Sequence, residues 1–414
     1  MEPAITRTNE GPQTGGQWAV RWHGLVFFAV LTASVPLCHL LWHQLLGRDE
    51  PWLRTRSQVA APAPTADTVL DGSWMLAKET QLREDTPVTW WLRATWNEWR
   101  YRLGVPTSPQ VHFGKDEWFF IQESVRPDRA AFERAMPERR RFLAEVRDLV
   151  RQAGAELFLV VHPDKARVYP EFCYADGVMP PAKRDNYALI LADLAAVGIP
   201  TVDLAAAVAA ERATNPEVEL YYHRDTHWRP AGALAASRAV AAAIEAKFGA
   251  VLGPRANVRV TGPTAVRLVG DLVANMGIGS IEVRDGPRTG DAQLDAALQW
   301  RTAPISFLCE RLTELREYYG LDLERGGAFV AMDGKDPAAP ILHLGASFAH
   351  ENGTTGMALF LGRPVRSIIR FGAVGFDPLR AALPELRAGT RAKVVVWDIV
   401  ERGFFAPGWR EPKL

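Results

Sequence analysis

The sequence has few cysteines and no excess of charge of either sign. It holds three cysteines, Cys38, Cys173 and Cys309, and no metal-ligand spacing links them. A fold stapled by several disulfides is therefore excluded, whereas one bridge between Cys173 and Cys309 stays open. Lys and Arg (48) balance Asp and Glu (48), and no basic block stands out. We therefore expect no binding of nucleic acid, which needs a concentrated basic face.

The sequence also lacks the common motifs for binding nucleotides and zinc. The sequence has neither a glycine-rich phosphate loop nor a dinucleotide-binding fingerprint. The cysteines and histidines also form no zinc pattern. We therefore expect no cofactor and no metal. Nearly half of the residues are apolar (48%) and 23% are charged, which is compatible with a globular core.

One segment near the N-terminus carries no charge at all. From Gly24 to Leu46 there is no Asp, Glu, Lys or Arg. A bilayer core of about 30 Å needs roughly 20 helical residues, so the length is suitable. We predict a tail over residues 1–22 and a transmembrane signal anchor over residues 23–46. A cleaved signal peptide is the alternative, but the run is long and lacks a small-residue cleavage site at its end.

After this anchor, the sequence predicts a linker and a Trp-rich helical segment over residues 47–109, then a folded domain over residues 110–414. In this domain short apolar strands alternate with helices, which predicts an α/β fold with a parallel sheet covered on both faces. Residues 250–340 are less regular and are expected to contain an insertion. The expected strands cover 156–161, 199–204, 341–345, 365–371 and 393–400. The expected helices cover 186–197, 230–248, 356–361 and 378–386, and another has Pro137 in its first turn.

An aspartate stands two positions before a histidine in this domain. Asp225 and His227 lie just ahead of the helix expected to open at Pro230, and Ser347 directly follows the strand expected over 341–345. Such residues are the parts of a catalytic triad: the aspartate orients the imidazole, the histidine takes the serine proton, and the oxygen attacks an acyl carbon. Because ligands sit at the carboxyl ends of parallel strands, all three could share one rim of the sheet.

Each of these residues also has a purely structural interpretation. Ser347 could cap the following helix. A hydrogen bond between Asp225 and His227 could simply hold a loop in place. We expect Asp225 and His227 to lie in an extended segment, in which both side chains point the same way. His223 is a competitor, since it too stands two positions from Asp225.

Three weaker candidates lie near predicted strand ends. Lys165 could anchor an anionic sugar or steady the rim of the sheet, or it could be a solvated lysine. Arg370 could offer charge to an oxyanion or to the substrate. The backbone amides of Ser347 and Phe348, close to a helix start, could donate to an oxyanion.

Taken in order, these motifs resemble those of a known family. The similar segments are Asp225-Thr226-His227-Trp228, Gly345-Ala346-Ser347-Phe348, 396–402, 114–120, 163–170 and Gly270-Asp271-Leu272. They resemble the SGNH-hydrolase-like alginate O-acetyltransferase family, the AlgJ/AlgX group, over most of the chain outside the anchor. The resemblance implies an SGNH-hydrolase-like catalytic domain, and the order of Asp-x-His before Ser is that of this family.

The resemblance also implies an activity and a location. The enzyme would transfer acetyl groups to an exopolysaccharide that is alginate-like or cellulose-like. Ser347 would carry the acyl group, His227 would activate it and Asp225 would hold His227. The acetyl group would arrive through a membrane-bound O-acyltransferase partner. The domain would stand in the periplasm, held to the inner membrane by one span, with the tail in the cytoplasm.

Two other functions stay open. A polysaccharide esterase on the same scaffold would use the same residues with water as the acceptor. A non-catalytic polysaccharide-binding subunit of an acetylation complex is the second alternative, because Ala346 stands where many relatives have Asp or Thr. The chain ends soon after Arg402, so we expect the membrane-anchored type without the carbohydrate-binding module that some soluble relatives add.

Overall fold

The protein is described from a computed structural model, which covers residues 65, 67–68, 73–77, 87–278, 280–284, 300–304, 311–370 and 376–405. The predicted anchor over residues 23–46 lies outside these ranges. Within them, no helix combines the length and the apolar character that crossing a bilayer requires. The chain divides into two compact units, Met1–Trp96 with Ile281–Ser306, and Asn97–Ser280 with Phe307–Leu414.

The first unit contains most of helix α4 (Pro87–Arg102) and of a two-stranded sheet formed by β5 (Ser280–Arg284) and β6 (Trp300–Pro304). The second unit is built around a four-stranded parallel sheet in the order β10-β9-β11-β3. Its strands are β3 (Glu156–His162), β9 (Ile341–Gly345), β10 (Val365–Ile369) and β11 (Val394–Val400). Each lies within two residues of a predicted strand, and the predicted α/β class is confirmed.

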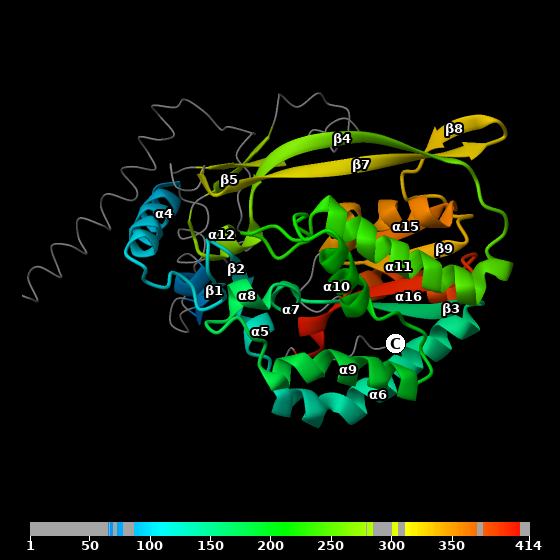
Figure 1. The fold of residues 1–414 in the computed structure, drawn as a ribbon, viewed down its shortest axis with the longest axis horizontal. Coiled ribbons are helices and arrows are strands. Elements are labelled where there is room, and N and C mark those ends of the chain that lie inside the picture. The colour runs from blue at the N-terminus through cyan, green and yellow to red at the C-terminus, as the bar shows by residue number, and fades with distance from the viewer. Residues whose placement is uncertain are drawn as a thin grey trace, which may run out of the picture. The chain divides into compact units, whose positions relative to one another are not determined.

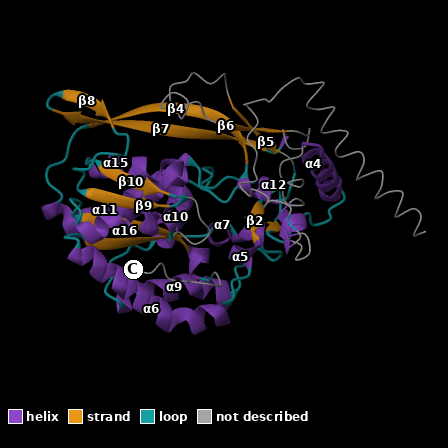
Figure 2. Cartoon of the chain, turned by 180° about the vertical axis from the view of Figure 1, so that it is seen from behind, coloured by secondary structure: helices purple, strands orange, loops and turns teal. Residues whose placement is uncertain are grey.

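Helices cover both faces of this sheet (Figures 1 and 2). Successive residues of β3 point to opposite faces, as a strand requires: Leu157 and Leu159 belong to one core cluster, Phe158 and Val160 to the other. The helices of the first cluster are α6 (Arg129–Gln152), α9 (Pro181–Ala196) and α16 (Asp377–Ala388). Those of the second are α10 (Leu204–Thr214), α11 (Pro230–Phe248) and α15 (Thr354–Leu361). Burial on both faces explains why the strands are continuous apolar runs.

Two predicted elements are wrong. Pro137 lies inside α6, which begins at Arg129 because the Asp128 side chain accepts a hydrogen bond from Ala131 N at 2.9 Å and caps the helix there. The strand expected over 199–204 does not form. Leu159 N donates to Pro200 O at 3.0 Å, but Pro200 has no N–H with which to continue a ladder.

The predicted insertion builds a second, antiparallel sheet in the order β4-β7-β8. Its strands are β4 (Val258–Val269), β7 (Thr313–Arg325) and β8 (Ala328–Ala331). In Figures 1 and 2, β4 and β7 form a long ribbon on the side of the central sheet that α11 and α15 cover. This ribbon carries residues into the candidate site.

Shorter elements complete the second unit. They are β1 (Val111–Phe113), β2 (Phe119–Ile121), α5 (Gln122–Val125), α7 (Lys165–Val168), α8 (Pro170–Cys173), α12 (Asp271–Asn275), a π turn at Ala349–Gly353, and 3-10 turns at Gly249–Val251 and Glu401–Phe404. β1 and β2 pair as an antiparallel hairpin. Cys173 is buried, and Cys309, with which a bridge was left open, lies outside the described residues.

Candidate active site

Asp225 and His227 lie in a tight loop that an isolated β-bridge between Tyr221 and Trp228 closes. Tyr222 N donates to His227 O at 3.1 Å across the loop. The segment is a turn, so the expectation of an extended segment was wrong. Instead, Asp225 Oδ1 accepts a hydrogen bond from His227 N at 2.9 Å. An aspartate that bonds to the backbone two residues ahead is a common way to stabilise a turn.

The two side chains form the contact that a triad requires. Asp225 Oδ1 lies 2.5 Å from His227 Nδ1, and the side chains are 0% and 11% exposed. A carboxylate at Nδ1 favours the tautomer that carries its proton there, which leaves Nε2 as the acceptor. His227 Nε2 is buried and has no hydrogen-bond partner among the described residues. The arrangement therefore presents an imidazole nitrogen that can take a proton.

Neighbouring charges set the protonation of this pair. Burial by itself raises the pKa of Asp225, but the Arg316 guanidinium, the His227 imidazole and the hydrogen bonds to this carboxylate together outweigh burial and hold that pKa well below its usual range. Burial by itself lowers the pKa of His227, but the charge and hydrogen bond of Asp225, together with the Asp271 carboxylate, outweigh burial and the net pKa is raised. Asp225 is therefore ionised, and His227 is a stronger base than an isolated histidine.

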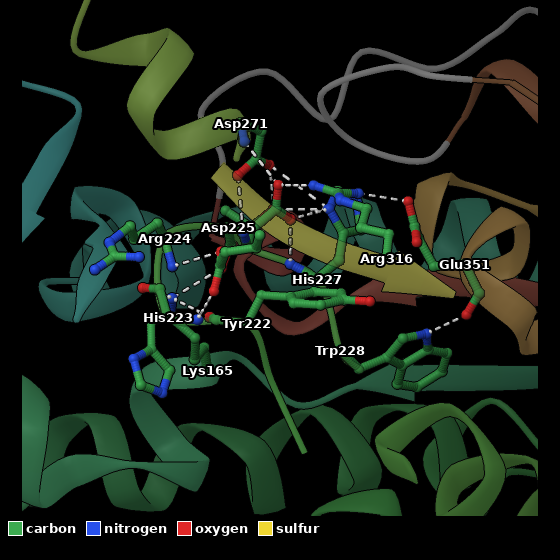
Figure 3. Close-up of polar contacts among 12 residues, drawn as sticks. Lys165, Tyr222, His223, Arg224, Asp225, His227, Trp228, Asp271, Arg316 and Glu351 are labelled. Carbon is green, nitrogen blue, oxygen red and sulfur yellow. Dashed lines mark hydrogen bonds and ion pairs between the residues drawn. The ribbon is translucent and has the colours of Figure 1, made fainter. Parts of the chain in front are cut away.

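Arg316, on β7, connects the Asp225 loop to the segment after Ser347 (Figure 3). Its guanidinium pairs with Asp225 Oδ2 and lies 2.6 Å from Glu351 Oε1. Trp228 Nε1 donates to the Glu351 carbonyl at 2.7 Å. Two independent contacts thus fasten the loop that carries the histidine to the turn that carries the serine.

Ser347 lies directly after the carboxyl end of β9, as predicted, and is partly buried. The ring of Phe348, the next residue, lies 5.0 Å from the His227 ring between centroids. The fold therefore brings the serine turn against the histidine. Among the described residues no hydrogen bond joins Ser347 to His227, and the role of Ser347 as nucleophile stays a prediction.

A second buried polar cluster lies behind Phe348, whose ring stacks on His162 at 5.0 Å. Asp398 Oδ2 lies 3.0 Å from His162 Nε2 and 2.8 Å from His343 Nε2, and His343 Nδ1 lies 2.9 Å from Thr354 Oγ1. Burial raises the pKa of Asp398, but the two imidazoles outweigh it and hold that pKa far below its usual range. The cluster joins β3, β9 and β11 immediately beneath the serine turn.

Lys165 supports the loop. Its ammonium is buried and donates to the carbonyls of Tyr222, His223 and Asp225 at 3.0, 2.9 and 2.8 Å. The expectation of a solvated lysine was wrong, the alternative in which Lys165 steadies the rim fits this geometry, and the sugar contact stays a prediction. Burial lowers the pKa of Lys165 to about 8.

Two functional positions on β7 escaped the sequence analysis. Glu314 and Arg316 are two positions apart, so their side chains lie on the same face of the strand. Glu314 accepts hydrogen bonds from His223 N at 2.8 Å and from Arg224 N at 3.0 Å. Charged residues are normally exposed, so their spacing alone gave no signal of burial.

His223 is not the partner of Asp225. Its Nε2 lies 2.6 Å from Glu219 Oε1, and its ring stacks on Trp118 with 4.2 Å between centroids. The choice of His227 over His223 is therefore consistent with the geometry.

Asp271, at the start of α12, holds the other side of the pair. Its backbone N–H donates to Asp225 Oδ2 at 2.7 Å, and its carboxylate accepts from Thr226 N at 2.8 Å. This approach requires a glycine before it, since a Cβ on Gly270 would lie 2.1 Å from Arg224 O. Burial, followed by the nearby Asp225 carboxylate, raises the pKa of Asp271.

Asp225, His227 and Asp271 place possible metal-ligand atoms within 4.8 Å of one another. The Arg316 guanidinium already supplies a positive charge to Asp225 there, and each Asp225 oxygen has a partner. These residues fit an ion-pair network better than a metal centre. The expectation of no metal stays a prediction.

Arg370 is exposed, and its side chain donates to the carbonyl of Ile369 at 2.9 Å. Its backbone N–H donates to Gly345 O at 3.1 Å, which places it near the end of β9. Residues 371–375, which follow it, lie outside the described ranges. The oxyanion or substrate roles of Arg370 and of the Phe348 amide stay predictions.

Parts of the chain are similar to known proteins. Residues 111–297, which include Asp225, His227 and Asp271, match the family model described as an SGNH hydrolase-like domain, acetyltransferase AlgX. A probable alginate O-acetylase AlgJ of Pseudomonas syringae pv. tomato is 31% identical over 195 residues, 47% of this chain and 48% of that protein. Its namesake from Pseudomonas putida is 30% identical over 199 residues, 48% of this chain and 50% of that protein.

The chain thus spans about half the length of the curated relatives it matches. Among solved structures, the O-acetyltransferase domain of Pseudomonas putida AlgJ aligns with a TM-score of 0.53 and 22% identity, over 72% of this chain and 92% of that domain. This similarity shows a shared fold, and the matching family model describes an SGNH hydrolase-like domain. The resemblance to the AlgJ/AlgX group inferred from the motifs is confirmed.

Proposed function

We propose that the protein is a polysaccharide O-acetyltransferase that works through Ser347, His227 and Asp225. The observation that carries the proposal is the buried His227, whose Nδ1 contacts Asp225 while its Nε2 has no partner among the described residues and its ring lies against Phe348. The names of the relatives, which are acetylases, and of the matching family model support the same class of enzyme.

In the first half-reaction, Ser347 Oγ attacks the acetyl carbonyl carbon of the donor while His227 Nε2 takes the hydroxyl proton. The tetrahedral intermediate then collapses, and His227 returns the proton to the leaving group. The product is an acetyl ester on Ser347. In the second half-reaction a sugar hydroxyl attacks this ester, His227 takes its proton, and the proton passes to Ser347 Oγ as it leaves.

The surrounding charges suit this cycle. Asp225 remains ionised and stabilises the imidazolium that forms in each half-reaction. Arg316 keeps Asp225 ionised, and the amide of Asp271 fixes the second carboxylate oxygen. Both groups are in place before the reaction, so little reorganisation is needed as charge develops.

The acceptor and the cellular setting belong to the same proposal. Alginate appears in the names of the relatives, which supports an exopolysaccharide acceptor. The uncharged segment over residues 23–46 supports a single-pass anchor with the domain in the periplasm. A membrane-bound O-acyltransferase would then supply the acetyl group, as the resemblance to the AlgJ/AlgX group implies.

The test is acetylation of the protein itself by an activated acetyl ester such as p-nitrophenyl acetate, followed by mass spectrometry of its peptides. We expect acetyl on the peptide with Ser347, and faster release when an oligosaccharide acceptor is added. Ser347→Ala should reduce turnover by about 10³-fold or more. Ser367→Ala is the control, since Ser367 is a partly buried serine on the neighbouring strand β10.

Either of two results would contradict the proposal. Acetyl transfer that survives Ser347→Ala would remove Ser347 from the mechanism. Hydrolysis that no oligosaccharide accelerates or diverts would identify an esterase with water as the acceptor.

A further inference from the structure

A cavity of about 500 Å³ opens beside the β1–β2 hairpin. Three aromatic side chains, Tyr101, Phe113 and Phe119, line it together with the charged Arg102, Glu117 and Arg311. Its volume lies within the range of roughly 300–1,000 Å³ typical of small-ligand sites. The triad proposed above uses none of these residues.

The aromatic side chains form one packed group. The ring centroids of Phe113 lie 5.9 Å from Tyr101 and 5.4 Å from Phe119, both in edge-to-face arrangements. Phe119 is buried, whereas Tyr101 and Phe113 are partly exposed. Partly exposed aromatic rings in a concave site offer a rigid apolar surface with a polar tip at the tyrosine. The C–H face of a sugar ring packs well on such a surface.

The charged side chains favour an anion. Arg311 Nη2 donates to Glu117 Oε1 at 2.8 Å, and Glu117 also pairs with Arg224. Arg102, which also lines the cavity, pairs with Glu98 at 2.6 Å, so Arg311 is the guanidinium that faces a ligand. The Arg311 side chain is 60% exposed, so most of its five donors stay accessible. A guanidinium binds a carboxylate through two parallel hydrogen bonds.

The backbone beneath the cavity is strained. Asp116 and Glu117, in the turn between β1 and β2, have φ values of 53° and 58°. Two successive residues with positive φ form a hairpin turn that usually takes Asn and Gly, because other side chains are disfavoured there. Strain of this kind is commonly kept where it serves a site. Here it directs the Glu117 carboxylate between two arginines.

The cavity is also joined to the triad loop. Phe119 N donates to His223 O at 2.8 Å, and the ion pair of Glu117 with Arg224 reaches the residue before Asp225. A ligand held in the cavity would therefore be anchored on the element that positions the proposed base.

We infer that this cavity is an acceptor subsite that binds one acidic sugar unit of the polysaccharide, with its ring on Phe113 and Tyr101 and its carboxylate on Arg311. The inference rests on the proposed function for the nature of the acceptor. Beyond the proposed function, it identifies the place where the polymer binds and the chemical group, a carboxylate, that the protein recognises.

The experiment measures the Kd of the full-length chain for a hexamer of mannuronic acid and for cellohexaose, an uncharged hexamer. We expect tighter binding of the acidic hexamer, weakened by salt. Arg311→Gln should raise its Kd by roughly tenfold, since it removes a charge-assisted hydrogen bond. Phe113→Leu should weaken both hexamers, because it removes the ring but keeps apolar volume.

Arg259→Gln is the matched control, because the Arg259 side chain is 57% exposed and pairs with one carboxylate, that of Asp322. It should leave both Kd values within twofold, and circular dichroism should show every variant folded. Kd values unchanged by Arg311→Gln and by Phe113→Leu would overturn the subsite.

Ser347→Ala separates this inference from the proposed function. It should abolish acetyl transfer while the Kd for the acidic hexamer stays within twofold. Acetyl transfer that survives Ser347→Ala would defeat the proposed mechanism and leave the binding result intact. Loss of binding in Ser347→Ala, with no effect of Arg311→Gln, would place the sugar at the triad and overturn the cavity.

Discussion

Arg316 and Asp225 form an ion pair in which the Asp225 side chain is fully buried and the Arg316 side chain is 8% exposed. The pair joins the antiparallel ribbon to the turn before α11. A buried charge is tolerated when it is paired and hydrogen-bonded, and both partners here have further contacts.

Replacing Arg316 with Gln should harm both stability and catalysis. Asp225 would be left buried without its cation, so we expect the free energy of unfolding to fall by about 3–5 kcal/mol in urea titrations. Arg316 also acts to lower the pKa of His227, and its removal should raise that pKa further. The matched Arg259→Gln should cost less than about 1 kcal/mol. Equal losses in the two variants would show that burial of the Arg316 pair is unimportant.

The rate of serine acetylation should rise with pH. The base works only when neutral, and the pKa of His227 is raised from 6.5, so the midpoint should lie above 6.5. The stability that protonated His227 contributes is complete below pH 6.5 and is lost as pH rises through the folded-state pKa. Activity should therefore increase as this contribution fades. Asp225→Asn should lower both the rate and the midpoint, as measured by pH–rate profiles and by NMR titration of His227. A native midpoint at or below 6.5 would argue against the arrangement.

Deprotonation of Lys165 should lower the rate of acetylation at basic pH. Its pKa is lowered to about 8 by burial, and the neutral amine has two N–H donors for three carbonyls. We expect the rate to fall reversibly above about pH 8 as the loop loosens. The folded-state pKa lies below the unfolded value of 10.5, so this group adds stability as pH rises from about 8 to 10.5. A fall in rate while circular dichroism shows the protein still folded would support a role of Lys165. A flat rate from pH 8 to 10 would refute it.

Asp398→Asn should disturb the serine turn from beneath. His162 and His343 both contact Asp398 Oδ2, and an amide in its place keeps an oxygen but loses the negative charge, so both contacts should weaken. We expect a loss of about 1–3 kcal/mol in unfolding free energy, together with slower acetylation of Ser347. The folded-state pKa of Asp398 is depressed, so its stabilisation is present above pH 3.8 and is lost as pH falls further. The difference from the native chain should therefore shrink in acid. Asp322→Asn is the control and should change neither property, because the Asp322 carboxylate pairs with Arg259, whose side chain is 57% exposed, and lies outside the cluster of Asp398, His162 and His343.

The sequence predicted the sheet well where strands are buried on both faces. β9 and β11 are continuous apolar runs, which are a strong local signal. The segment over 199–204 is apolar only in part, Pro200 within it cannot donate to a ladder, and the Asp203 side chain caps α10, which begins at Leu204. The signals against a strand there are local, so the sequence already contained them.

The candidate site was predicted only in part. Asp225 and His227 are neighbours in sequence, so their contact follows from a local turn. Arg316 lies 91 residues from Asp225, and Glu351 lies 35 residues from Arg316. Such pairings depend on how the ribbon folds back over the central sheet. An arginine in an irregular region gave no reason to expect burial.

Gly270 has a consequence for any survey of mutations in this protein. It offers no group for proton transfer, but any side chain there would collide with Arg224 O and move the Asp271 amide away from Asp225. A systematic substitution screen scored by acetylation would therefore rank Gly270 beside Asp225 and His227. Only a rate of acetylation measured on correctly folded variants would distinguish Asp225 and His227, whose side chains take part in the reaction, from Gly270, where no side chain fits.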